Sequence, residues 1–389
     1  MRPKHRILRL LRDEGPLSRA ELGDRLALSR SRVVAELEHL IAGDLVQEAG
    51  SAASRGGRRS TLVELHSDLR FAGIDLGVTS IDLEITNGRL EPVAAVREPA
   101  DIRSGPKTVL GRVDAILAEL RSDGAYARLS GIGIGVPGPV SFRDGVPASP
   151  PIMPGWDGYP VRELLARKHS CPVVVDNDVN IMAMGERYAG VARSADDVLF
   201  VKIGSGVGCG IFIGGELYRG PDGCAGDIGH IQVETDDPVC SCGHIGCLEA
   251  LFSGIALERD ATAAGRSGQS LALAERLAAR GTVTARDVAE CAAGGDTIAT
   301  RLIRDGGGRL GSVLAGLVSF INPSMIVIGG GLTGLGHVLL GEIRSAVYRR
   351  SLPLATGNLP VVLSELGPRA GVAGAGFLAS DLAFAEAAS

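Results

Sequence analysis

The stretch FAGIDLGVTSIDLEI, residues 71–85, consists of two apolar runs joined by a short turn. The runs 71–76 and 80–85 predict a pair of strands, because apolar residues dominate both runs and Gly77 marks the turn between them. Strand-like and helix-like segments alternate from there on. Helices are predicted at 109–120, 179–189 and 298–321, and strands at 132–136, 173–175, 198–203, 209–213 and 325–328. This alternation predicts an α/β body in two lobes, with ligands at the strand ends between them.

The composition fits a chain of several compact domains. Of the 389 residues, 45% are hydrophobic and 22% charged, so that each large part can bury a core. The longest uncharged stretch, 310–341, contains Asn322, Pro323 and three consecutive glycines, which indicates buried core rather than a membrane span. Since the N-terminus has no apolar run typical of a secretory signal, we expect a cytoplasmic protein. In that compartment the seven cysteines favour a metal site or free thiols over disulfides.

Residues 1–68 predict a separate small domain of three helices and a hairpin. A first apolar stripe ends at Gly15, the capping box 18–21 opens a second helix, and Ser29 caps a third helix that ends at Gly43. Short strands follow on both sides of a Gly-rich and Arg-rich tip at 50–60. This order of elements is typical of a winged helix-turn-helix domain, which inserts one helix into the major groove.

Basic residues gather where this domain would contact double-stranded operator DNA. They outnumber acidic residues in the head, whereas acidic residues dominate the rest and give a net charge of -5. The candidate DNA contacts start the third helix and line the wing: Ser29, Arg30, Ser31, Arg32, Arg55, Arg58 and Arg59. The alternative is an ordinary three-helix cap with a solvated charged loop, but the positions of the arginines favour DNA binding.

The strongest chemical signal is a cluster of cysteines and histidines at 230–247. Cys240, Cys242 and Cys247 lie in one short loop. Three thiolates and one imidazole form a ligand set that suits tetrahedral structural zinc, so chance clustering is the weaker interpretation. His230 and His244 are both candidates for the fourth ligand.

A second polar group follows the predicted strand 173–175. It is the run Asp176-Asn177-Asp178-Val179-Asn180, in which a carboxylate can serve as a general base toward a sugar hydroxyl while an Asn beside it hydrogen bonds to a neighbouring hydroxyl. The alternative is that Asp178 only caps the helix.

Three glycine-containing turns are candidates for phosphate or nucleotide contacts. Their residues are Asp75, Gly77 and Thr79 in the first turn, Gly204, Ser205, Gly206 and Gly208 in the second, and Gly330 in the third. Such turns are common in a chain with 55 glycines, and neither the dinucleotide pattern nor the Walker pattern is present. The residues alone therefore support a small-molecule site rather than any particular nucleotide.

Taken together, these motifs resemble the ROK family, named for repressors, open reading frames and sugar kinases. The most specific part joins GDIGH at 226–230 to C-x-C-G-x-x-G-C-x-E at 240–249, and the resemblance extends over nearly the whole chain. It implies a two-lobed, actin-like sugar-kinase fold of the ribonuclease H-like type, with lobes at 69–190 and 191–369 and a C-terminal helix at 370–389. Members with a winged helix-turn-helix head resemble the xylose and N-acetylglucosamine repressors.

The resemblance also implies residue roles. Structural zinc would be bound by His230, Cys240, Cys242 and Cys247. Sugar hydroxyls would contact Asn177, Asp178, Asp227, His230 and Glu249. In a kinase member Asp178 would be the catalytic base, and ATP with Mg²⁺ would contact the three glycine-containing turns.

Two departures from the family pattern weaken the kinase interpretation. Asp227 stands where the family usually has Glu, and Ile152 lies in a loop where kinase members often have Asn. The sequence therefore favours a sugar-responsive transcriptional repressor of carbohydrate metabolism genes, with a monosaccharide effector in the cleft. We expect it to bind a palindromic operator as a homodimer or homotetramer. The alternative is an ATP-dependent, glucokinase-like hexose or aldose kinase with an accessory DNA-binding head.

Overall fold

The computed structural model describes residues 2–51, 61–236 and 238–388. The chain divides into two compact units, the first made of Met1–Ile181 and Gly371–Ser389 and the second of Met182–Ala370. The first unit is therefore discontinuous in sequence, because the chain returns to it after completing the second.

The head of the first unit is a winged helix-turn-helix domain, as predicted. Its elements are α1 (Pro3–Glu14), β1 (Leu17–Ser18), α2 (Arg19–Leu26), α3 (Arg30–Ala42), β2 (Val46–Ser51) and β3 (Thr61–Leu65). The side chain of Ser18 accepts from the Glu21 N–H while the Glu21 carboxylate accepts from the Ser18 N–H, so the capping box is confirmed. Ser29 accepts from the Arg32 N–H and starts α3. The three strands pair in the order β1-β3-β2.

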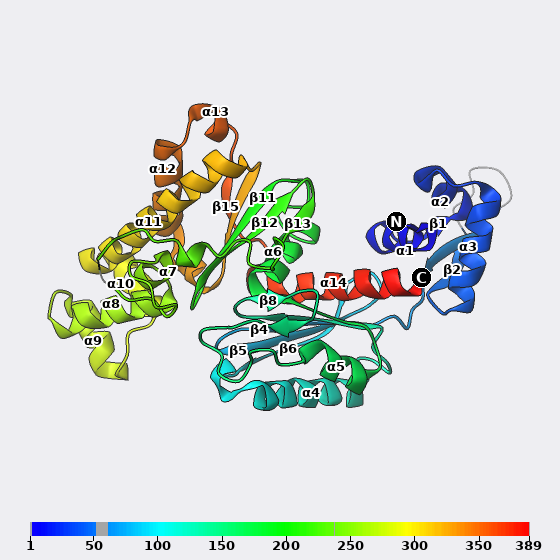
Figure 1. The fold of residues 1–389 in the computed structure, drawn as a ribbon, viewed down its shortest axis with the longest axis horizontal. Coiled ribbons are helices and arrows are strands. Elements are labelled where there is room, and N and C mark those ends of the chain that lie inside the picture. The colour runs from blue at the N-terminus through cyan, green and yellow to red at the C-terminus, as the bar shows by residue number, and fades with distance from the viewer. Residues whose placement is uncertain (1, 52–60, 237, 389) are drawn as a thin grey trace. The chain divides into compact units, whose positions relative to one another are not determined.

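The body of the first unit is a five-stranded sheet in the order β10-β7-β4-β5-β6. Its strands are β4 (Phe71–Leu76), β5 (Ser80–Thr86), β6 (Pro92–Pro99), β7 (Gly131–Val136) and β10 (Val173–Asn177), with a small hairpin of β8 (Val140–Ser141) and β9 (Val146–Pro147). The helices are η1 (Ile102–Ser104), α4 (Pro106–Ser122), α5 (Val161–His169) and α14 (Ala370–Ala387). Figure 1 shows α4 and α14 on opposite faces of this sheet.

The second unit contains another five-stranded sheet, in the order β13-β12-β11-β14-β15. Its strands are β11 (Val198–Ile203), β12 (Val207–Ile213), β13 (Glu216–Tyr218), β14 (Met325–Gly329) and β15 (Val361–Leu363). The α-helices are α7 (Leu248–Leu251), α8 (Gly254–Arg266), α9 (Leu271–Arg280), α10 (Ala285–Ala293), α11 (Thr297–Ile321), α12 (Gly336–Arg350) and α13 (Pro353–Thr356). Short 3-10 helices are η2 (Ile228–His230), η3 (Gly331–Leu335) and η4 (Gly367–Arg369). Helix α6 (Asp178–Tyr188) begins in the first unit and ends in the second.

The two sheets have the same topology. In each, the first strand pairs antiparallel with the second and parallel with the fourth, while the third and fifth strands lie at the edges. Consequently the turn after the first strand occupies the equivalent place in both units. These two turns, Gly77–Thr79 and Gly204–Gly206, belong to the predicted phosphate-binding segments.

Helix α14 packs unusually close to the sheet of the first unit. A Cβ atom at Gly73 on β4 would overlap the carbonyl oxygen of Val372, and one at Gly133 on β7 would overlap that of Ala375. Only glycine fits these two positions, because the helix backbone occupies the space of a side chain. Within the described ranges, no helix is long and apolar enough to cross a membrane.

Candidate functional site

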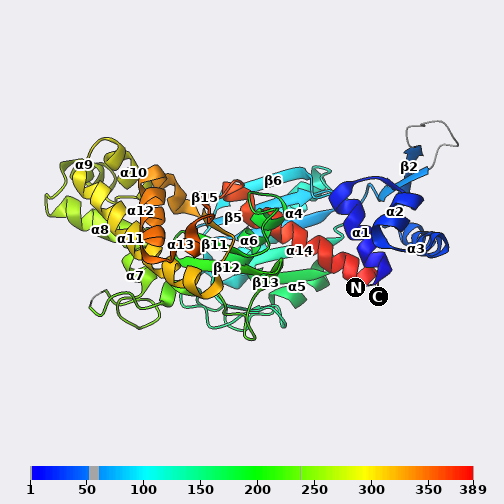
Figure 2. The same cartoon turned by 90° about the horizontal axis from the view of Figure 1, so that it is seen from above.

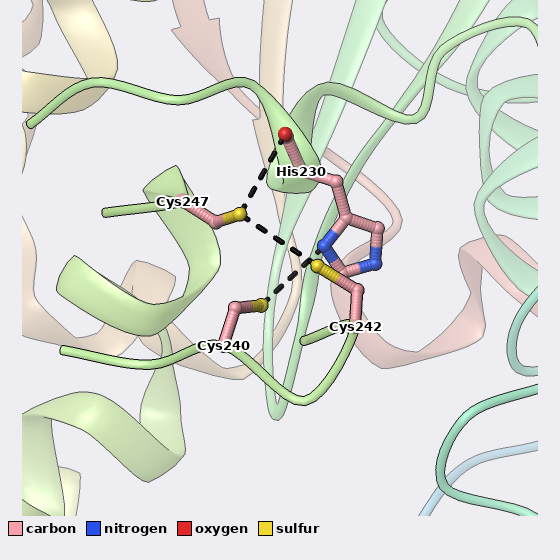
Figure 3. A group of neighbouring side chains, drawn as sticks. All are labelled: His230, Cys240, Cys242 and Cys247. Carbon is pink, nitrogen blue, oxygen red and sulfur yellow. Dashed lines mark hydrogen bonds between the residues drawn. The ribbon is translucent and has the colours of Figure 1, made fainter. Parts of the chain in front are cut away.

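Three cysteines and one histidine come together in the second unit (Figure 3). The ligand atoms of His230, Cys240, Cys242 and Cys247 all lie within 4.8 Å of one another. His230 ends η2, and Cys247 directly precedes α7. Cys240 and Cys247 are 5% and 0% exposed, so part of the group is shielded from water.

Backbone contacts fix the loop that carries the cysteines. The N–H of Cys240 donates to the carbonyl oxygen of His244 at 2.7 Å, and the N–H of Gly243 donates to that of Cys240 at 2.9 Å. Gly246 has a φ of +70°, and a Cβ there would overlap the carbonyl oxygen of Glu234. The glycines of the motif are therefore needed for the turn itself.

The two histidines occupy different places. His230 Nδ1 lies 3.5 Å from Cys240 Sγ. His244 is exposed, and its Nδ1 lies 3.4 Å from Cys242 Sγ. Of the two, His230 is the one that shares a cluster with all three sulfur atoms in the part of the chain that the structure describes.

The other ring nitrogen of His230 faces a carboxylate. Its Nε2 lies 4.0 Å from an oxygen of Asp227, whose side chain is half-exposed. One nitrogen therefore faces the sulfur atoms and the other faces Asp227. A carboxylate on the far side of a ligand histidine is a common way to orient its ring.

The local surroundings shift the acidity of two thiols in opposite directions. A hydrogen bond from the His244 backbone lowers the pKa of Cys242 to about 6, which favours the metal-binding thiolate. Burial raises the pKa of Cys247 to about 12. A thiolate at Cys247 therefore needs nearby positive charge, and a bound cation would supply it.

Glu249, on α7, contacts the turn between β11 and β12. Its Oε2 accepts a hydrogen bond from the backbone N–H of Val207 at 3.0 Å. A Cβ at Gly206 would overlap the same carboxylate oxygen, so the turn needs glycine there to approach Glu249. The predicted sugar contact and the predicted phosphate turn are thus joined directly, a link between distant residues that the sequence pattern does not reveal.

At the end of β10, the side chain of Asn177 is already engaged. Its Nδ2 donates to the carbonyl oxygen of Gly138 at 2.7 Å, and its Oδ1 accepts from the Val179 N–H at 2.9 Å. Asp178 is 4% exposed and lies in the first turn of α6. The side chain of Asn177 therefore holds the start of this helix.

Asp176, the first residue of the polar run 176–180 and not one of the predicted site residues, supports this segment. The carboxylate of Asp176 accepts from the Asn177 N–H and from Asn180 Nδ2, both at 2.8 Å. The sequence signal is the short polar run Asp-Asn-Asp-x-Asn directly after a predicted strand. When such polar side chains are buried, they are expected to hydrogen bond to one another.

The glycine-containing turns are held by short backbone hydrogen bonds. The N–H of Gly77 donates to the carbonyl oxygen of Ser80, and that of Gly204 donates to the carbonyl oxygen of Gly206, both at 2.9 Å. Glycine is needed at Gly330 for two structural reasons: its φ is +90°, and a Cβ there would lie 2.5 Å from the Ile203 carbonyl oxygen.

The predicted site residues divide between the two units. Asp75, Gly77, Thr79, Asn177 and Asp178 belong to the first, and Gly204, Ser205, Gly206, Gly208, Asp227, His230, Glu249 and Gly330 to the second.

The predicted DNA-contacting end of α3 is exposed. Ser29, Arg30, Ser31 and Arg32 all face solvent. Arg32 forms an ion pair with Glu36 at 2.6 Å, one turn further along the helix. The predicted wing residues Arg55, Arg58 and Arg59 lie outside the described residues.

A winged helix-turn-helix head on an actin-like α/β body defines a class of protein in which a DNA-binding domain is joined to a sugar-kinase fold. The chain belongs to the ROK family, whose model matches residues 71–382. The head precedes the matched region.

Known relatives include both repressors and kinases. The chain is 30% identical over 385 residues to the xylose repressor of Caldicellulosiruptor bescii, covering 95% of this chain and 92% of the relative. It is also 30% identical to the glucokinase of Thermotoga maritima, covering 79% of this chain and 96% of the kinase. A solved structure of a ROK family transcriptional regulator, a homolog of the E. coli MLC protein, superposes with a TM-score of 0.83 at 25% identity, covering 99% and 96% of the two chains.

Proposed function

We propose that this chain is a sugar-responsive transcriptional repressor of carbohydrate metabolism genes. The observation that carries the proposal is the folded winged helix-turn-helix head, with Arg30 and Arg32 exposed at the start of α3. The coverage of the relatives supports it, since the xylose repressor aligns with 95% of the chain and the glucokinase with 79%. Action on operator DNA requires a cytoplasmic location.

The operator is expected to be a palindrome bound by a homodimer or homotetramer. Dimeric helix-turn-helix proteins match the two-fold symmetry of their operators, with half-sites spaced by whole turns of DNA. Selection of genomic fragments by the purified protein, followed by sequencing, tests the proposal. An enriched inverted repeat supports it, and the absence of any enriched repeat at moderate salt contradicts it.

Zinc is the metal that the Cys₃His cluster fits best. Soft thiolate and imidazole ligands at mutual distances within 4.8 Å suit a tetrahedral, closed structural site. His230, Cys240, Cys242 and Cys247 would hold the ion. The ion would supply the positive charge that stabilises the thiolates and would cross-link η2 to the loop before α7.

The sugar effector is expected to contact the residues that the resemblance to the ROK family implies, namely Asn177, Asp178, Asp227, His230 and Glu249. Asp227, His230 and Glu249 offer acceptors and one ring nitrogen in the second unit, and Asp178 offers a carboxylate in the first. Carboxylates accept hydrogen bonds from the hydroxyls of a monosaccharide, and a ring nitrogen can donate or accept one. Asn177 contributes through backbone positioning, because its amide is engaged by Gly138 and Val179.

An ATP-dependent sugar kinase is the second candidate. It is favoured by Asp178 as a candidate base and by the two equivalent turns around Gly77 and Gly204. ATP turnover measured with Mg²⁺ and a panel of aldoses separates the two functions, with Asp178→Asn as the control. Sugar-dependent turnover that disappears in Asp178→Asn supports a kinase, and sugar binding without turnover supports the repressor.

A further inference from the structure

Helix α14 joins two distant places of the first unit. Its first turn touches the end of β4, where a Cβ at Gly371 would overlap the carboxylate of Asp75. Its second half reaches the head, since Ala379 and Phe384 belong to the same buried cluster as Leu8 and Leu11 of α1. Figures 1 and 2 both show α14 running along the sheet toward α1. An 18-residue helix is about 27 Å long.

Arg12 of α1 makes the main polar contact between the head and α14. Its side chain is 1% exposed. Its guanidinium lies 4.0 Å from the centre of the Phe377 ring and donates to Ser380 Oγ at 2.8 Å. It also lies 3.6 Å from Asp381, while Nε donates to Asp13 at 2.8 Å.

Two further side chains of α1 approach the same acid. Arg9 approaches Asp381 at 3.3 Å and His5 approaches it at 3.5 Å. Phe384 packs edge-on against Phe71 at the start of β4, with ring centres 5.8 Å apart. The head is thus attached to α14 by a buried arginine and a shared apolar cluster, whereas the aromatic pair attaches the same end of α14 to β4.

The first turns of α14 are closely packed against the sheet of the first unit. The helix backbone is in direct contact with Gly73 and Gly133, so its first turns cannot move toward the sheet. Close-packed interfaces change by shifts of whole elements rather than by gradual compression. A displacement of the Asp75 carboxylate toward Gly371 would therefore press on the first turn of α14.

We propose that α14 couples the Asp75 turn to the DNA-binding head and that Arg12 is the positioning residue that holds the head on this helix. The regulatory meaning of this coupling rests on the proposed repressor function. Ligand binding near Asp75 would then alter the freedom of the head through α14, without any contact between ligand and head.

Hydrogen exchange of the α1 amides in the full-length protein tests the physical coupling. Arg12→Met keeps an apolar stem over Phe377 but removes the charge, and we expect about tenfold faster exchange in α1 and in the second half of α14. The matched control is Arg19→Met, since Arg19 is a head residue whose ion-pair partner, Glu48 on β2, lies outside α1 and α14. Equal exchange in Arg12→Met and wild type would overturn the role of Arg12.

Two glycine variants test transmission from the far end. Gly371→Ala places a methyl group against Asp75, whereas the nearest atom to a new Cβ at Gly376 is Thr86 Oγ1 at 3.9 Å. Both variants replace a glycine of α14 by alanine, but only Gly371→Ala crowds Asp75, so we expect only this variant to change exchange in α1. The change should vanish when Arg12→Met is also present. Unchanged exchange of the α1 amides in Gly371→Ala overturns the coupling. If Gly371→Ala does not fold, Asp75→Ala changes the same contact, and unchanged α1 exchange in that variant overturns the coupling in the same way.

DNA binding separates this inference from the proposed function. The measurement uses DNA fragments selected by the wild-type protein, with D-xylose, D-glucose and N-acetyl-D-glucosamine as probes. In Arg12→Met the operator affinity should be about the same with and without sugar, a ratio of about one. A wild-type protein that selects no DNA overturns the repressor function, while the exchange results still decide the coupling. A sugar response preserved in Arg12→Met overturns the inference and leaves the repressor function standing.

Discussion

The carboxylate of Glu249 accepts a hydrogen bond from the backbone N–H of Val207 at 3.0 Å. Glu249 lies in α7, two residues after the cluster residue Cys247, and Val207 directly follows the Gly204–Gly206 turn. A single hydrogen bond thus connects the cysteine cluster, a candidate sugar contact and a candidate phosphate turn. Order in the metal loop and order in the turn are expected to depend on each other.

Removal of this hydrogen bond should destabilise the second unit. Glu249→Ala leaves the buried Val207 N–H without its acceptor, which we expect to cost about 1–3 kcal/mol of unfolding free energy. Glu249→Gln retains an acceptor of the same size and should recover most of that stability, but it loses the charge for the sugar hydroxyls. Denaturant unfolding and sugar titration of both variants check this, and an Ala variant as stable as wild type would contradict the bracing role.

Zinc should be bound at about one ion per chain. Cys242→Ser removes one thiolate, and we expect the second unit to lose about 2–4 kcal/mol of stability. Elemental analysis of protein purified without added metal measures the zinc content. A folded protein with almost no zinc would refute the assignment.

The single tryptophan supplies an internal control for the zinc variant. Trp156 is fully buried in the first unit, where its ring N–H donates to the carbonyl oxygen of Ile102 at 3.0 Å. Its fluorescence should therefore report unfolding of the first unit and remain close to wild type in Cys242→Ser. A matching loss in the tryptophan transition would show that the variant disturbs the chain as a whole.

Lengthening Asp227 should alter sugar recognition. Asp227→Glu restores the residue usual in the family and extends the carboxylate by one methylene beside His230. If Asp227 contacts the sugar directly, the preferred sugar should change; if a water molecule intervenes, only the affinity should change. Calorimetry with glucose, xylose, mannose and their N-acetylated relatives distinguishes these outcomes, and identical profiles would remove Asp227 from the site.

The head should bind duplex DNA in a salt-dependent manner. Removal of Arg58 and Arg59 should weaken binding to all sequences and reduce the salt slope by about one unit per lost phosphate contact. Arg30→Ala should instead relax sequence preference if Arg30 reaches a base edge. Fluorescence anisotropy at several salt concentrations measures both effects, and a slope unchanged by loss of the wing arginines would argue against phosphate contacts there.

Local elements of the fold were predictable from the sequence. The strand Val198–Ile203 has the bounds that its apolar run predicts, and Ser18 and Ser29 start helices as their capping patterns indicate. These features depend on neighbours in sequence. The helices α8, α9 and α10 were harder to recognise, because small Ala and Gly side chains in 261–295 obscure the apolar period.

Long-range relationships were not predictable. The motif points to His230 and the three cysteines, but nothing in it indicates that Glu249 meets Val207 or that Asn177 is engaged by Gly138. The matching order of strands in the two units is equally hidden, because strand order is set by pairing between residues that are far apart in the sequence. The need for glycine at Gly73 is explained only by the structure, in which the backbone of α14 lies directly against β4.

The return of α14 to the first unit has a consequence for biosynthesis. The second unit is continuous, so it can close on the ribosome as soon as Ala370 has emerged. The first unit needs Gly371–Ser389, which is translated after the second unit, before Gly73 and Gly133 are covered and Arg12 contacts Phe377. The DNA-binding head is made before the second unit, yet its support is made after that unit. A nascent chain that stops short of α14 would therefore carry a head with no helix to dock on.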